Sequence, residues 1–197
     1  TRWLSDWSSD VCSSDLEDMQ AAAAWLQLGK GHEAREILRR LIWNTRSPPD
    51  DQTLSQLRQL VLRSYLTDQR LVDAQTAVIR YRQDYPQGAG NWPLLEARLF
   101  LRTRQPQAAL DVLQGGKGTD ADMLRLFALL RTGASPPAKV MQKADAIGSN
   151  RKLPVAQRTH AWFIAAEAAE SLNNPVARIQ ALQNGLGLQP GLLDQDP

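Results

Sequence analysis

Apolar residues recur at helical spacing in two stretches near the start of the chain. A short turn at residues 29–31, with two glycines, separates the stretches and breaks the periodicity. The spacing predicts a hairpin of two helices over residues 21–42, with the charged residues between 33 and 40 on its exposed face. The apolar stripes are Ala21, Ala22, Trp25 and Leu28 in the first helix, and Ala34, Ile37, Leu38 and Leu41 in the second.

The same pattern returns four times, so we expect about five antiparallel hairpins and an all-α chain. A loop rich in proline separates the first two hairpins, and Asp50 or Asp51 at its end is the expected N-cap of the next helix. The further hairpins cover residues 54–81, 91–113, 123–144 and 162–186.

Each second helix carries a small residue where the two helices of its hairpin are expected to meet. These anchors recur about every 36 residues, close to the ~34-residue period of tetratricopeptide repeats. Around Ala74 the sequence also resembles that family in its larger residues, with Tyr65 before the anchor and Pro86 after it. The resemblance implies a right-handed superhelical solenoid over residues 17–190. The anchors are Ala34, Ala74, Ala109, Ala138 and Ala177.

In tetratricopeptide-like arrays the first helices line a concave groove. The resemblance implies that eight positions of this chain face such a groove, as an apolar strip with two arginines at equivalent places. Because guanidinium groups bind carboxylates in a bidentate way, the groove favours a partner segment with acidic residues or a free C-terminus. The groove residues are Gln59, Arg63, Asn91, Leu94, Arg98, Met123, Phe127 and Trp162.

Composition and charge indicate neither a nucleic-acid partner nor a membrane-spanning segment. The formal net charge of +2 is too small to indicate a nucleic-acid partner, which normally meets a strongly basic stripe or patch. No apolar stretch is long enough to span a membrane. Arg35, Arg39 and Arg40 form a short basic face, which we interpret as solvated helix surface partly paired with neighbouring glutamates.

The two ends of the chain need separate treatment. Residues 1–16 fit neither a signal peptide nor an amphipathic helix, and the run from Asp6 to Leu16 resembles a translated sequencing adapter. We therefore expect residues 1–16 to be non-native and disordered. Residues 191–197 are expected to be a truncated linker or the start of a further helix, because the last hairpin has no polar cap.

No residue pattern predicts a reaction, a cofactor or a metal site. The glycine-rich run at 115–119 resembles a phosphate loop only superficially, because Lys117 is followed by Gly118 and the preceding residues are helical. His32 and His160 lack a second ligand at the spacing that a metal-binding helix face needs. The only cysteine, Cys12, lies in the adapter-like segment. We expect no enzyme activity in this chain.

The leading hypothesis is a protein-interaction scaffold that binds a partner peptide or domain in the concave groove. The alternative is the non-catalytic helical platform of a larger bacterial cell-envelope enzyme, such as a murein lytic transglycosylase, whose helical superhelix is similar in architecture. That alternative favours the periplasm. The sequence beyond Pro197 would separate the two, since a lysozyme-like domain there would make this chain its platform. An RNA-binding repeat is disfavoured, because no repeated pair of polar base-reading residues is present.

Overall fold

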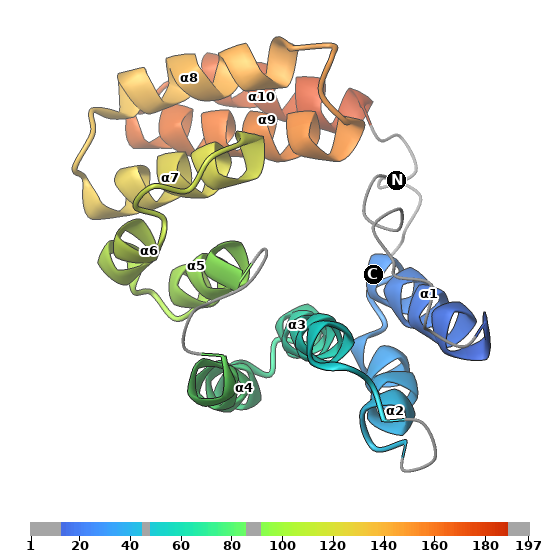
Figure 1. Ribbon diagram of the computed structural model, residues 1–197. Coiled ribbons are helices and arrows are strands. Elements are labelled where there is room, and N and C mark those ends of the chain that lie inside the picture. The colour runs from blue at the N-terminus through green and yellow to red at the C-terminus, as the bar shows by residue number, and fades with distance from the viewer. Residues whose placement is uncertain (1–12, 45–47, 86–91, 189–197) are drawn as a thin grey trace. The chain divides into compact units, whose positions relative to one another are not determined.

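The computed structural model describes residues 13–44, 48–85 and 92–188. Within these ranges the chain is all-α, as predicted, and its helices contact mainly their neighbours in sequence (Figure 1). Asn91, Pro86 and residues 191–197 lie outside the described residues. The helices are α1 Ser13–Gln27, α2 Gly31–Ile42, α3 Asp51–Thr67, α4 Leu71–Asp84, α5 Trp92–Arg102, α6 Pro106–Val112, α7 Thr119–Thr132, α8 Pro137–Ser149, α9 Val155–Ser171 and α10 Pro175–Gly187.

The chain forms two compact units, Thr1–Leu95 and Glu96–Pro197, which divide within α5. In the first unit α1 contacts both α2 and α3, and in the second α7 contacts both α8 and α9. A first helix therefore packs on its own partner and also on the first helix of the next hairpin. This arrangement is typical of helical arrays, in which each repeat contacts its neighbours.

The turns inside the hairpins share a conformation. Each contains one residue with positive φ, which lets the chain reverse within three or four residues. Three of these residues are not glycine, and a left-handed backbone is uncommon for two of them, Gln69 and Arg104, whereas asparagine tolerates it better. The recurrence of one turn geometry in five helix pairs supports the predicted hairpin repeat. The residues and φ angles are Gly29 at 74°, Gln69 at 56°, Arg104 at 59°, Gly133 at 69° and Asn173 at 53°.

The first unit buries the residues that join its helices. Ala34 and Ala74 are fully buried, as expected of anchors, and Tyr81 is buried with its hydroxyl 2.7 Å from that of Ser55. The Tyr81 ring stacks on Trp92 with 3.7 Å between ring centroids. Asp50 caps α3, because its carboxylate accepts the Thr53 N–H at 2.6 Å.

Two expectations for α1 are wrong. The helix begins at Ser13, so residues 13–16 are helical rather than disordered. Met19 and Leu26 fill the core, whereas Leu28 is exposed because the helix ends at Gln27. The remainder of the adapter-like segment, residues 1–12, lies outside the described residues.

In the second unit the predicted anchors need correction. Ala138 is exposed, and Val140 and Ala144 occupy the buried face of α8 in its place. Ala177 is only half-buried, whereas Ala181 is buried. The prolines that begin α8 and α10 start each helix close to these alanines, so the buried positions come two to six residues later.

Candidate functional site

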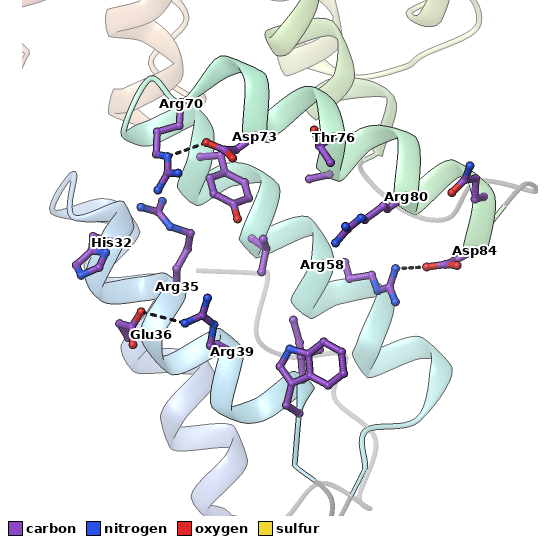
Figure 2. Close-up of a pocket in the computed structure, with 16 residues that line it drawn as sticks. His32, Arg35, Glu36, Arg39, Arg58, Arg70, Asp73, Thr76, Arg80 and Asp84 are labelled. Atoms are coloured by element: carbon purple, nitrogen blue, oxygen red, sulfur yellow. Dashed lines mark hydrogen bonds and ion pairs between the residues drawn. The ribbon is translucent and has the colours of Figure 1, made fainter.

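Helices α2, α3 and α4 of the first unit enclose a cleft of about 920 Å³ (Figure 2). Helix α3 contacts both α2 and α4, so it forms the floor and the other two helices form the walls. We call this surface the arginine cleft. Its lining residues are His32, Arg35, Glu36, Arg39, Ile42 and Trp43 of the α2 side, Arg58, Val61 and Tyr65 of α3, and Arg70, Asp73, Thr76, Ala77, Arg80, Gln83 and Asp84 of the α4 side.

The lining carries an excess of positive charge. Five arginines face three carboxylates, which leaves a net charge of +2 with histidine neutral. The arginines come from three helices that are separated in sequence, so the fold gathers them. A cleft lined by one sign of charge raises the local concentration of ligands of the other sign. The arginine cleft is therefore suited to an anionic ligand.

Three of the five arginines are already held by carboxylates of the same unit. Arg35 lies 2.5 Å from Asp68, and Arg70 lies 2.8 Å from Asp73. The third, Arg58, is paired with Asp84. A ligand carboxylate would have to compete with these internal partners, so the three pairs mainly fix the shape of the cleft.

The Arg35 pair is the most elaborate of the three. Asp68 also accepts the backbone N–H of Gly31 at 3.0 Å, and the Arg35 guanidinium donates to the Ser64 hydroxyl at 3.4 Å. The guanidinium lies 4.9 Å from the centre of the Tyr65 ring. These contacts join the first turn of α2 to the last turns of α3, so they make one end of the cleft rigid.

Arg39 and Arg80 differ from the other three arginines. Arg39 is 4.0 Å from Glu36, and its side chain is 74% exposed. Arg80 has no hydrogen-bond or ion-pair partner among the described residues. Asp84 lies one turn beyond Arg80 on the same helix, but it is bound to Arg58. The positive charge of the cleft is thus available mainly at Arg39 and Arg80.

Apolar surface lies next to these two cations. Trp43 lines the cleft and is 76% exposed, which is unusual for so large an apolar side chain. Its backbone N–H donates to the Arg39 carbonyl at 3.1 Å, so the last turn of α2 places both residues on one side of the helix. Ile42 and Val61 also line the cleft.

The predicted groove residues do not form this site. Gln59 and Met123 are buried, so the expectation that they are exposed is wrong. Trp162 packs against α8 and α10 instead of an open groove, because Gly148 and Gly185 leave room for its side chain. For all three residues, packing between helices uses the helix face that the sequence pattern predicts to line the groove.

The other groove positions stay predictions. Arg63, Leu94, Arg98 and Phe127 are half-buried and therefore partly accessible. Arg63 belongs to the first unit and Arg98 to the second. The Phe127 ring lies 4.9 Å below the Arg131 guanidinium, which is itself paired with Glu167.

The sequence alone predicts a basic face on α2 but not the arginine cleft. Arg35 and Arg39 belong to the basic face that the sequence pattern predicts as solvated helix surface, and their position opposite Arg58, Arg70 and Arg80 depends on how α2 and α4 pack on α3. Recognising that three arginines have close internal carboxylates also needs the structure, since Arg35 and Asp68 are distant in sequence.

Two features are absent from the described ranges. No group of three or more histidine, cysteine, aspartate or glutamate side chains there could hold a metal ion. None of the helices in those ranges combines the length and apolar character needed to cross a bilayer. Comparison with protein-family models, curated proteins and solved structures found no match to the chain.

Proposed function

We propose that this chain is a protein-binding module whose arginine cleft binds an acidic protein segment. The observation that carries the proposal is the combination of two available arginines and an exposed tryptophan on one concave surface. Arginine and tryptophan are the side chains most enriched at the energetic centres of protein interfaces. An arginine guanidinium matches a carboxylate by two parallel hydrogen bonds.

The helical array supports this proposal. In helical arrays each repeat contacts only its neighbours, so side chains outside these contacts, such as those of the arginine cleft, are free to bind a partner. We further propose that the array is a tetratricopeptide-like superhelix, on the strength of the recurring turn geometry and the Ala74 repeat. In that case the arginine cleft lies on the side of the second helices, away from the groove that the first helices line.

A nucleic acid fits the cleft less well than an acidic protein. Most of the affinity for nucleic acids comes from cations that neutralise many phosphates. Here Arg35, Arg58 and Arg70 are paired with carboxylates of the same unit, and the lining carries a net charge of only +2. The exposed indole of Trp43 also offers apolar surface, which suits a protein side chain.

The test is a binding measurement in which fluorescence anisotropy reports the binding of labelled probes. It is done at about 150 mM salt, where exposed charges are well screened. The probes are a short peptide of glutamate and leucine, the same peptide with lysine in place of glutamate, and single-stranded RNA of similar length. We expect saturable binding of the acidic peptide and none of the lysine peptide. Tighter binding of the RNA, or equal binding of both peptides, contradicts the proposal.

A further inference from the structure

We infer that the arginine cleft recognises two carboxylates of one acidic segment, one at Arg39 and one at Arg80, together with an apolar side chain at Trp43. This inference rests on the proposed function and deepens it, because it names the groups that select the partner. Figure 2 shows Arg39 extending from α2 and Arg80 extending from α4 into the same space. The two cations therefore approach a bound segment from opposite walls.

The internal pairs explain why these two arginines are selected. Arg35 is 12% exposed and its partner Asp68 is 22% exposed, so a ligand that captured Arg35 would leave a carboxylate in a poorly solvated place. Arg58 and Arg70 likewise have carboxylate partners within the unit. Arg39, with a carboxylate only at 4.0 Å, and Arg80, with none among the described residues, can accept a ligand without breaking a close pair.

The placement of the two cations on different helices favours a ligand with two acidic groups over a single compact anion. They stand on different helices with the α3 floor between them, and Asp84, which could have bridged toward Arg80, is bound to Arg58. A segment with two carboxylates can bind the arginines of both walls at once. Its intervening residues then cross the floor beside Trp43, whose exposed ring provides the apolar contact.

The chain offers matched controls. Arg40 is an exposed arginine of the same helix as Arg39, but it does not line the cleft and lies 4.0 Å from Asp18. Arg40→Ala therefore changes the net charge as Arg39→Ala does, without touching the site. Val72 is an exposed apolar residue of α4 outside the cleft, and Val72→Ala serves as the control for Trp43→Ala.

The experiment measures dissociation constants for a set of capped peptides that carry two glutamates separated by leucines at varied spacing. For the best spacing, versions with either glutamate changed to glutamine and with the leucines changed to glycine are compared. The proteins are the full chain and its Arg39→Ala, Arg80→Ala, Trp43→Ala, Arg40→Ala and Val72→Ala variants. Circular dichroism confirms that each variant is as helical as the parent.

We expect Arg39→Ala and Arg80→Ala each to weaken the parent peptide at least about fivefold, as truncation of a central interface residue does. Each single-glutamine peptide should lose its sensitivity to one of the two arginine substitutions and keep it to the other. Trp43→Ala should weaken the leucine peptide and leave the glycine peptide unchanged. Both control variants should stay within about twofold of the parent.

Two results overturn the inference while the proposed function stands. One is an Arg40→Ala variant that weakens binding as much as Arg80→Ala, because binding then follows overall charge. The other is a result in which both arginine substitutions weaken every peptide by the same factor, because Arg39 and Arg80 then do not each bind a different glutamate. If no acidic peptide binds the unsubstituted chain, the inference and the proposed function both fail.

Discussion

Asp68 joins two helices of the arginine cleft through Arg35, whose guanidinium lies 2.5 Å from its carboxylate. The second oxygen of the same carboxylate accepts the Gly31 N–H, which begins α2. The N-cap residue of α2, Lys30, makes no side-chain capping bond. Asp68 therefore supplies from α3 the acceptor that a helix N-terminus normally finds in its own cap, and it holds one wall of the cleft to the floor.

Replacing Asp68 with alanine should destabilise the first unit by about 1.5–3 kcal/mol, because it leaves Arg35 and the Gly31 N–H without their acceptor. Hydrogen exchange of the α2 and α3 amides measures this loss locally. The control is Asp73→Ala, which removes a pair with side chains 53% and 41% exposed and should cost less than about 1 kcal/mol. Equal losses of stability in the two variants would show that the contacts of Asp68 stabilise the first unit no more than an exposed ion pair does.

Gly31→Ala should also destabilise the first unit. An added Cβ would lie 2.4 Å from the Ser64 carbonyl oxygen, a backbone atom that cannot move aside without shifting α3. Overpacking of this kind costs about 1–3 kcal/mol. The same change at Gly187 of α10 meets open space and should be neutral or stabilising by up to about 1 kcal/mol. Urea denaturation compares the two, and a Gly31→Ala protein as stable as the parent would contradict the described packing.

Trp162→Ala separates packing from binding. The ring packs against the buried Ala144, Ala165 and Ala181, so its removal should cost about 3 kcal/mol or more in the free energy of unfolding. Because Trp162 lies outside the arginine cleft, the folded variant should bind acidic peptides as the parent does. Loss of peptide binding in a variant that is still folded would show that Trp162 belongs to the binding surface, as predicted from the sequence.

Asp145 gives a pH-dependent prediction. Partial burial on α8 raises the pKa of this carboxyl above its ordinary value of 3.8. The folded state then disfavours the charged form, and the penalty is fully present above the folded pKa and absent below the unfolded pKa. Asp145→Asn should therefore stabilise the protein at about pH 7, with a gain that disappears as the pH falls below about 4. A gain independent of pH would exclude burial of the charge as its cause.

The helices could be predicted because residues close together in the sequence determine where each helix begins and ends. The periodicity of apolar residues located the hairpins, and the proline-rich loop predicted an N-cap at Asp50 or Asp51, of which the structure shows Asp50. The turns at 29–31, 67–69 and 173–175 were found from composition, although Gln69 carries a positive φ that its residue type does not favour. The sequence alone could not place Ala138 and Ala177, whose burial depends on where each helix begins.

The arginine cleft could not be predicted because it depends on pairing between helices. Which face of α9 meets its neighbours is decided by two glycines on other helices, Gly148 and Gly185, and this turns Trp162 into a packing residue. Likewise, Arg80 is available only because Asp84 binds Arg58. Such competition among side chains of different helices cannot be predicted from the spacing of residues within one helix.

The most direct test of the binding account is a two-dimensional amide NMR titration of the full chain with the two-glutamate peptide. If the arginine cleft binds the peptide, the amides that shift on binding cluster around Arg39, Trp43 and Arg80, on α2, α3 and α4. Shifts that cluster instead around Arg63, Leu94, Arg98 and Phe127 would place the binding surface in the groove of first helices and contradict the assignment of the arginine cleft.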